Sequence, residues 1–347
     1  MPNFLEKSII ATVCYYDVLN YPLTGFEIYK YLINVDFIKR HNDKALKQVQ
    51  NDRADISFYD IIEALENSLE LRKIIFQKNG FYFLKGRDEI IKKHIWRKKI
   101  ADEKWKKARR IIWFFDCIPF IRMITISGSL ALGNTCRESD LDLLIVAKTG
   151  RIWTCRTLVT FLTILLGVRR HGNVTRDKIC LNHYIVDKSL EIPFKSLYNA
   201  QSYARLVPII DKNGFIFKQF QKANSWIGEY LLFWPRTSRR YPGMSPTKNL
   251  RAIKSNKVLI SLAKFLEIVL NDKIGNFFEK KLAKYERARI EKDPLKEKPG
   301  GRIVANDTQL EFHPNSPEVR IIQGFNARMK KLGFLELACQ KDSGLVK

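Results

Sequence analysis

Two short motifs place residue types suited to phosphate chemistry near each other in the chain. Gly128 and Ser129 follow a short apolar run, and ten residues separate Ser129 from Asp140. A glycine at a turn lets backbone N–H groups approach phosphate oxygens without a Cβ in the way, and a neighbouring serine hydroxyl adds a donor. The turn is therefore predicted to bind β- and γ-phosphate oxygens.

Asp140 and Asp142 begin an apolar, β-rich stretch that runs to Ala147. Residues two apart in a strand project from the same face, so the two carboxylates are expected on one side. Paired carboxylate oxygens suit Mg²⁺, or Mn²⁺, which keeps several waters and bridges to substrate phosphates. Nearby polar side chains are further candidates for contacts with the triphosphate or its acceptor: Arg137, Ser139, Arg151 and Arg156.

The Gly-Ser pair, the ten-residue spacer and the Asp-x-Asp pair together resemble the signature of the polymerase-beta-like nucleotidyltransferase superfamily. The resemblance covers roughly residues 120 to 195. It implies a small mixed-sheet domain that uses magnesium to move a nucleoside monophosphate from a triphosphate to a hydroxyl or phosphate acceptor.

The chain departs from this family at one position. The family commonly supplies a third carboxylate from a later strand, but the run Lys178–Val186 contains no acidic residue, and Asn182 is the expected equivalent. An amide cannot take the acceptor's proton, so this change weakens catalysis unless another group acts as the base. The open alternatives are acids at the strand ends or the histidine in the strand: Asp177, Asp187, Glu191 and His183.

Residues 118–195 are predicted to form the nucleotidyltransferase core. Its expected strands are Met123–Ser127, Asp142–Ala147 and Lys178–Val186, with an apolar helix at Trp153–Val168. This order of strands and helix describes a small α/β unit within an α+β chain. The apolar part of the helix is about half the length needed to cross a bilayer, which favours a buried helix over a membrane span.

Residues 1–87 are predicted to form a winged-helix-like domain. A β-hairpin is expected around Asn79-Gly80, because both residues tolerate positive φ. The basic stretch Lys39–Lys47 is expected to be an insertion between the second and third helices. Three segments with helical periodicity precede the hairpin: Leu5–Leu19, Phe26–Ile33 and Tyr59–Leu69.

The remaining segments are predicted to be helical. Residues 88–117 form a strongly basic pattern that is typical of a connecting helix, and residues 196–347 read as a helical C-terminal region. Its expected helices are Ser196–Ile210, Phe215–Phe233, Lys257–Glu291 and Glu318–Leu332.

The charge of the chain favours a polyanionic partner. Lys and Arg number 61 against 36 Asp and Glu, a net charge of +25. Such a field attracts nucleic acid, an anionic membrane surface or triphosphates, although a lysine-rich composition also serves solubility. The six cysteines form no C-x-x-C pair, and the N-terminus lacks a secretory pattern, so a cytoplasmic location is expected.

The leading hypothesis is a cytoplasmic nucleotidyltransferase with RNA or DNA as the first candidate acceptor. The alternative is a catalytically weakened protein that binds nucleotides or nucleic acid in a regulatory role, which Asn182 motivates. A third hypothesis is a DNA-binding regulator led by residues 5–87, because winged helices often dock on duplex grooves.

Overall fold

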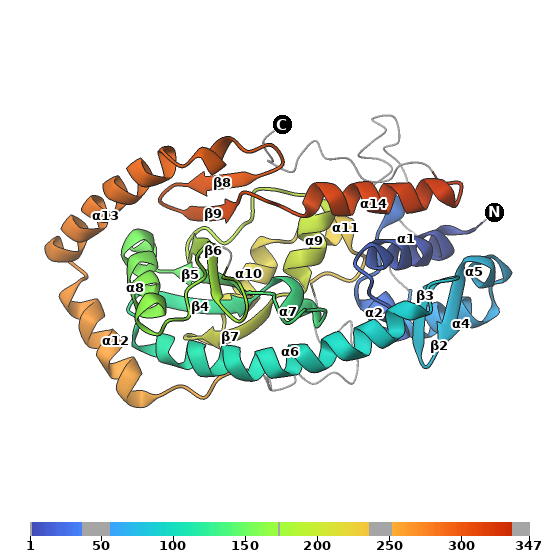
Figure 1. Ribbon diagram of the computed structural model, residues 1–347, viewed down its shortest axis with the longest axis horizontal. Coiled ribbons are helices and arrows are strands. Elements are labelled where there is room, and N and C mark those ends of the chain that lie inside the picture. The colour runs from blue at the N-terminus through green and yellow to red at the C-terminus, as the bar shows by residue number, and fades with distance from the viewer. Residues whose placement is uncertain (1, 37–55, 173, 236–251, 335–347) are drawn as a thin grey trace.

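The computed structural model describes residues 2–36, 56–172, 174–235 and 252–334. Within these ranges the protein is α+β and contains a three-stranded and a six-stranded sheet (Figure 1). The predicted insertion at Lys39–Lys47 lies outside the described residues. No helix in the described ranges is both long and apolar enough to cross a membrane.

The N-terminal unit contains the predicted helices and hairpin. Strands β2 (Ile75–Lys78) and β3 (Phe81–Leu84) pair in antiparallel fashion around Asn79 and Gly80, which both have positive φ. Strand β1 (Leu23–Thr24) pairs with the other edge of β3. The third predicted helix ends early because Ser68 starts a new one. The helices are α1 (Phe4–Val18), α2 (Gly25–Lys30), α4 (Phe58–Asn67) and α5 (Leu69–Ile74).

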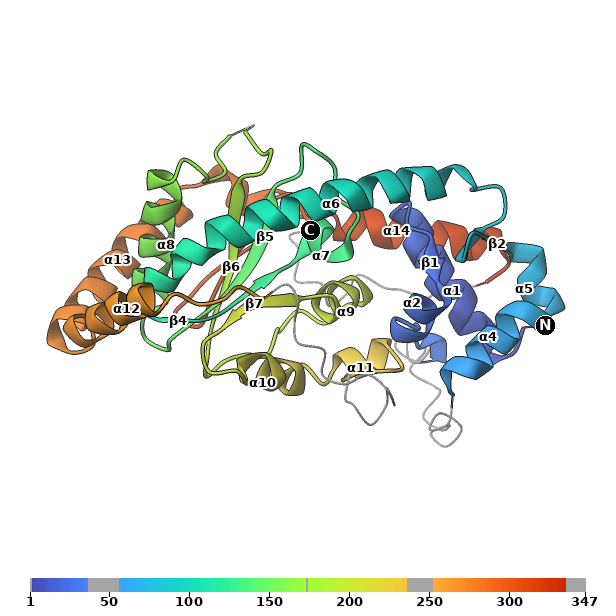
Figure 2. The ribbon, with the colours of Figure 1, turned by 90° about the horizontal axis from the view of Figure 1, so that it is seen from below.

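Helix α6 (Glu89–Trp113) confirms the predicted connecting helix. It runs from the N-terminal unit along the six-stranded sheet to the short 3₁₀ turn Phe114–Cys117 (Figure 2). Its buried side chains include Ile100, Trp105 and Ile112, which recur at helical spacing, whereas most of its lysines are exposed. The aromatic and aliphatic side chains thus anchor the helix, and the basic face is left to solvent.

The six-stranded sheet has the order β7-β4-β5-β6-β9-β8. Strands β5 and β6 are parallel and are joined through helix α8 (Ile152–Leu165), while the other neighbours are antiparallel. The sheet is therefore mixed, as expected. The strands are β4 (Ile121–Ile126), β5 (Leu141–Ala147), β6 (Ile179–Val186), β7 (Val207–Asp211), β8 (Arg302–Ala305) and β9 (Gln309–His313).

The prediction of a helical C-terminal region is wrong in part, because β7, β8 and β9 come from residues 196–347. The run Val207–Asp211 is apolar and follows a real helix, so periodicity alone could not separate it from that helix. Pro208 is tolerated in β7 because this strand lies at an edge of the sheet. The helices of this region are α9 (Leu197–Ala204), α10 (Ile216–Ala223), α11 (Ile227–Tyr230), α12 (Lys257–Val269), α13 (Lys273–Glu291) and α14 (Glu318–Lys331).

The sheet separates two hydrophobic cores. On one face Leu144 and Ile185 pack in a cluster shared with α9, α14 and the N-terminal unit. On the other face Leu143 and Tyr184 pack in a cluster shared with α6 and α8. Helix α14 also lies beside α1, where Arg328 pairs with Asp17 at 2.6 Å. The C-terminal helix therefore ties the N-terminal unit to the sheet.

Candidate active site

Asp140 and Asp142 converge at the start of β5, as the strand spacing predicts. One ligand atom of each carboxylate and the Cys180 sulfur all lie within 4.8 Å of one another. Cys180 belongs to β6 and is the register partner of Asp142. Two adjacent strands thus present two hard oxygen ligands and a thiol at one point.

The Gly128 turn lies directly against these carboxylates. Gly128 has φ of +61°, and a Cβ added to it would collide with the Asp142 carboxylate. The backbone of Ser127 donates to the Asp142 carbonyl at 3.0 Å, which fixes the end of β4 to the start of β5. The Ser129 hydroxyl donates to Thr135 at 3.2 Å. Glycine is therefore required here by both backbone conformation and space.

Lys104 of α6 holds the loop that precedes Asp140. Its buried ammonium donates to the carbonyls of Arg137 at 3.0 Å and Ser139 at 2.7 Å, and to Asp177 at 2.6 Å. The Ser139 hydroxyl accepts from the Cys136 N–H at 3.1 Å, so it closes the turn of the loop. The side chain of Arg137 is exposed. The loop residues thus serve first to position Asp140.

Arg170 contacts the site and was not predicted from the sequence. Its guanidinium pairs with Asp140 and lies 3.6 Å from the Cys180 sulfur. The backbone N–H of Arg170 donates to the carbonyl of Ile179 at 3.1 Å, which sets the segment beside the start of β6. The chain returns here only because α8 crosses over the sheet, and no local spacing indicates that.

The electrostatics of the pair favour a bound cation. Burial raises the pKa of Asp142 to about 6, and the charge of Asp140 adds to that rise, while Arg170 opposes it. A cation between the carboxylates would relieve both effects. Burial, with the nearby carboxylates, also raises the pKa of Cys180 far above its usual range. Its thiol therefore stays protonated, and the two carboxylates are the groups that fit Mg²⁺ or Mn²⁺.

Asn182 lies next to Asp142, at the position expected for the third carboxylate. Strand β6 has one more residue than β5 between Cys180 and His183, and Asn182 occupies this irregular stretch. Its amide nitrogen donates to Oδ1 of Asp142 at 3.2 Å. In this orientation Asn182 is a hydrogen-bond donor to the carboxylate and not a metal ligand.

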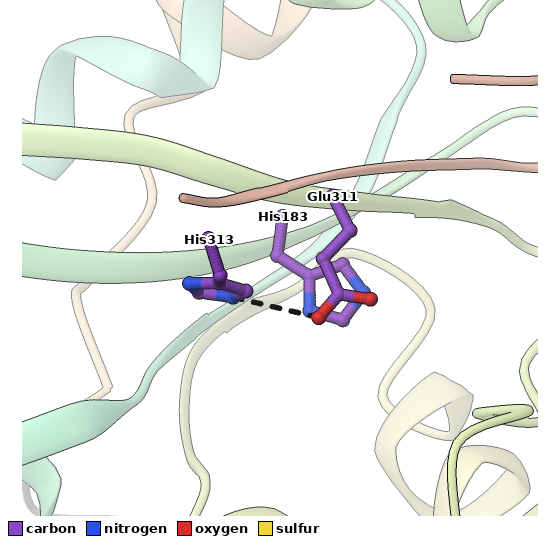
Figure 3. Close-up of side chains that lie close together, drawn as sticks. All are labelled: His183, Glu311 and His313. Atoms are coloured by element: carbon purple, nitrogen blue, oxygen red, sulfur yellow. Dashed lines mark ion pairs between the residues drawn. The ribbon is translucent and has the colours of Figure 1, made fainter. Parts of the chain in front are cut away.

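A second polar cluster, formed by His183, Glu311 and His313, adjoins Asn182, and Figure 3 shows its three side chains. Nδ1 of His313 lies 3.4 Å from the Asn182 amide nitrogen, and its Nε2 lies 3.6 Å from Oε1 of Glu311. Because the amide can only donate, Nδ1 must accept, and the ring proton is on Nε2, facing Glu311. The imidazole thus lies between the Glu311 carboxylate and Asn182, and its accepting nitrogen faces Asn182.

Glu311 is held in place by its own partners. It accepts from Arg302 at 2.8 Å and from Gln309 at 3.0 Å. The group His183, Glu311 and His313 has ligand atoms within 4.8 Å of one another, but Arg302 already balances the Glu311 charge. The tautomer of His313 also points a proton at Glu311. These contacts fit a hydrogen-bonded network better than a second metal centre.

The alternatives for the missing carboxylate are all engaged elsewhere. His183 is buried, with Tyr203 at 3.4 Å and Gln309 at 3.5 Å, and burial lowers its pKa to about 4. Burial opposes ionisation of Asp177, yet hydrogen bonds from Lys104 and Lys107 outweigh it and lower its pKa. Thr149 bonds Asp187, and Lys195 pairs with Glu191 at 2.9 Å.

Arg151 and Arg156 serve another part of the fold. Arg151 donates to the carbonyl of Leu270 at 3.1 Å, and Arg156 pairs with Glu286 at 3.2 Å. Both contacts attach α12 and α13 to the N-terminal end of α8. These arginines therefore position helices rather than phosphates.

Three comparisons with known proteins found no counterpart: no family model, no curated protein and no solved structure matches the chain. The geometry around Asp140 and Asp142 is therefore the basis on which the chemistry is assigned.

Proposed function

We propose that this protein is a magnesium-dependent nucleotidyltransferase of the polymerase-beta-like type, which moves a nucleoside monophosphate from a triphosphate to an acceptor hydroxyl. The observation that carries the proposal is the convergence of Asp140 and Asp142 beside the Gly128 turn, where a Cβ would overlap the Asp142 carboxylate. Two carboxylates beside a backbone turn that can bind phosphate are the parts that metal-assisted phosphoryl transfer requires.

Asp140 and Asp142 would hold the cation, which neutralises triphosphate charge and polarises the reacting oxygens when bound. The turn at Gly128 contributes backbone N–H groups, and Ser129 contributes its hydroxyl, to the β- and γ-phosphates. Arg170, which pairs with Asp140, would pair with the incoming phosphates instead once a cation occupies the carboxylates. These residues would thus bind and orient the phosphates of the substrate.

His313 is the group proposed to take the acceptor's proton. Asn182 cannot do so, and His313 lies next to it with Glu311 behind the ring. The acceptor hydroxyl would replace the Asn182 amide at Nδ1 of His313 and give its proton to that nitrogen, while the hydroxyl oxygen forms a bond to the α-phosphorus and the bond to the β-phosphate breaks. Pyrophosphate then leaves with that electron pair.

RNA or DNA is the proposed acceptor class, because α6 carries a cationic surface with aromatic rings. A cavity of about 680 Å³ near its end is lined by Lys106, Arg109, Arg110, Trp113, Phe114, Ile253 and Lys254. Phosphates pair with such cations, and unpaired bases stack on aromatic rings. The same helix carries Lys104, which holds the loop before Asp140.

A second candidate is a regulatory protein that binds nucleotides without transferring them. The observation that favours it is the Asn182 amide, which stands where the family commonly has a carboxylate and donates to Asp142. In this case the site would bind a triphosphate and magnesium, but turnover would be slow or absent.

The two candidates separate in one assay. The purified protein is incubated with each α-labelled nucleoside triphosphate, Mg²⁺ or Mn²⁺, and total RNA or DNA, and transfer of label is followed. Transfer that is lost in Asp140→Asn and Asp142→Asn supports the transferase. Tight nucleotide binding without transfer supports the regulatory protein, and neither binding nor transfer would overturn both.

A further inference from the structure

Helix α12 exposes most of its apolar side chains. It contains nine residues of the types Val, Leu, Ile, Phe and Ala among its 13, yet Ala263 is the only one that is buried. Val258, Phe265 and Ile268 are 74%, 61% and 75% exposed. The apolar face of such a helix is normally buried against other parts of a protein. An exposed apolar face of this size therefore indicates a binding surface.

The apolar stripe of α12 faces away from the protein. Val258, Leu262, Phe265 and Val269 recur every three or four residues and so share one side of the helix. The opposite side carries Glu267, which accepts from the Phe120 backbone at 2.7 Å and from Arg122 at 2.9 Å. Helix α12 is therefore attached through a polar contact and turns its apolar side outward.

Helix α13 has the same inverted arrangement. Its inward side carries Glu279, whose carboxylate accepts from the backbone N–H groups of Trp153 and Thr154 at 2.9 Å each. Ile274, Phe277 and Tyr285, three or more residues apart on the outward side, are 57%, 54% and 67% exposed. The two helices together form an arm, residues 257–291, with a largely apolar outer surface.

Most of the exposed charges of the arm are positive. Three of its four glutamates, Glu267, Glu279 and Glu286, are bonded to the body of the protein. Its six lysines are all exposed, and Nζ of Lys281 lies 4.5 Å from the ring centroid of Phe277. The lysines are Lys257, Lys264, Lys273, Lys280, Lys281 and Lys284. Apart from Asp272 and Glu291, the exposed charges of the arm are positive, and Lys281 lies beside the exposed ring of Phe277.

We propose that the α12–α13 arm docks on an anionic lipid bilayer. The apolar side chains would enter the region between headgroups and acyl chains, and the lysines would contact lipid phosphates. Charge complementarity selects this occupant, because the exposed charges of the arm are mostly lysines. A second copy of the chain would instead bring the same lysines face to face.

The position of the arm allows this mode of docking. Helices α12 and α13 form one end of the molecule, and α4 and α5 form the other end, in both views (Figures 1 and 2). Docking through the arm would leave the N-terminal unit pointing away from the membrane. This mode of docking uses helices that lie on the surface of the bilayer and requires no membrane-spanning helix.

The test is sedimentation of the full chain with vesicles of phosphatidylcholine, with and without phosphatidylserine. The protein is expected to bind the vesicles that contain phosphatidylserine, and added salt should weaken the binding. The triple variant Phe265→Ser/Ile268→Ser/Phe277→Ser should lose affinity by about tenfold or more, since it removes buried apolar area. The double variant Lys281→Glu/Lys284→Glu should weaken binding to the vesicles that contain phosphatidylserine, because it reverses two exposed charges of the arm.

The matched control is Tyr59→Ser/Leu69→Ser, which removes two side chains that are each 72% exposed at the far end of the molecule. It should bind vesicles as the unchanged protein does. Thermal unfolding followed by circular dichroism shows whether each variant is folded. Failure of the unchanged protein to bind, or equal binding by the triple variant, would overturn the proposal. A dimer that the triple variant dissociates, without vesicle binding, would assign the surface to a second copy instead.

Discussion

Gly128 and Asp142 are packed so closely that a Cβ at position 128 would overlap the Asp142 carboxylate. The contact joins the turn after β4 to the first residues of β5. The contact also puts the proposed phosphate-binding turn beside the proposed cation ligand. A substitution in the turn at Gly128 must therefore move the Asp142 carboxylate.

Gly128→Ala is expected to weaken nucleotide binding at the site. The methyl group would displace Asp142, and alanine at φ of +61° is strained as well, at a cost of about 1–2 kcal/mol. Gly133→Ala separates the two effects, because Gly133 has φ of +72° but nothing lies within 4 Å of its added Cβ. Triphosphate affinity, measured by calorimetry with Mg²⁺, should fall at least about tenfold in the first variant and stay unchanged in the second. Equal affinities would show that the turn does not contact the nucleotide.

Lys104→Met is expected to loosen the loop before Asp140. The substitution leaves two carbonyls and the Asp177 carboxylate without their buried donor, so unfolding free energy should fall by about 3 kcal/mol. Lys107→Met is the control, since Lys107 pairs with the same carboxylate at 2.5 Å but is half exposed. Its cost should be below about 1 kcal/mol. Urea unfolding of both variants measures the difference, and similar losses would contradict the role given to Lys104.

The parts of the site that a single segment encodes could be predicted from the sequence. Asp140 and Asp142 are two residues apart where β5 begins, so strand geometry predicts that they share a side, and the Gly128 turn is equally local. Helix α6 was predictable because its pattern runs for 25 residues. Each of these features depends on residues that are close neighbours in the chain.

The rest depends on sheet order, which no local pattern encodes. His313 and Glu311 reach Asn182 only because β9 pairs with β6, across more than a hundred residues of chain. Arg170 reaches Asp140 because α8 returns the chain beside β5. Strands β8 and β9 are short and border a loop rich in Pro, Gly and Lys, so the pattern of their residues indicates a strand only weakly.

His313→Gln is expected to slow nucleotide transfer without weakening nucleotide binding. Removal of a general base lowers turnover by about a hundredfold or more, whereas the phosphate contacts stay intact. Single-turnover transfer and calorimetric binding of the same triphosphate give the two values. The matched substitution His171→Gln alters an exposed histidine and should change neither. Unchanged turnover in His313→Gln would assign proton transfer to another group.

The stability of the protein should depend on pH through His183. Burial lowers the pKa of His183 from 6.5 to about 4 in the folded protein. Between pH 6.5 and 4 the unfolded chain binds a proton at His183 that the folded protein does not bind. The free energy of unfolding therefore falls as pH decreases from 6.5 to 4. The loss from this residue is about 3 kcal/mol and is complete below pH 4.

His183→Gln isolates this contribution. Glutamine does not titrate and can still bond Tyr203 or Gln309, so the variant is less stable at neutral pH but should lose less stability on acidification. Urea unfolding of both proteins across the same pH range gives the difference. Parallel pH curves for the two proteins would show that His183 titrates normally in the folded state.

Asp142→Asn is expected to stabilise the protein while it removes cation binding. Burial and the charge of Asp140 raise the pKa of Asp142 to about 6, so ionised Asp142 destabilises the folded state at neutral pH. An asparagine oxygen can keep the hydrogen bond from Asn182, and the variant should gain about 1–2 kcal/mol without Mg²⁺. Thermal unfolding with and without Mg²⁺ tests both parts. Mg²⁺ should raise the Tm of the unchanged protein and not that of the variant, because a bound cation stabilises only the fold that holds it. An equal rise in both would mean that the cation binds away from Asp142.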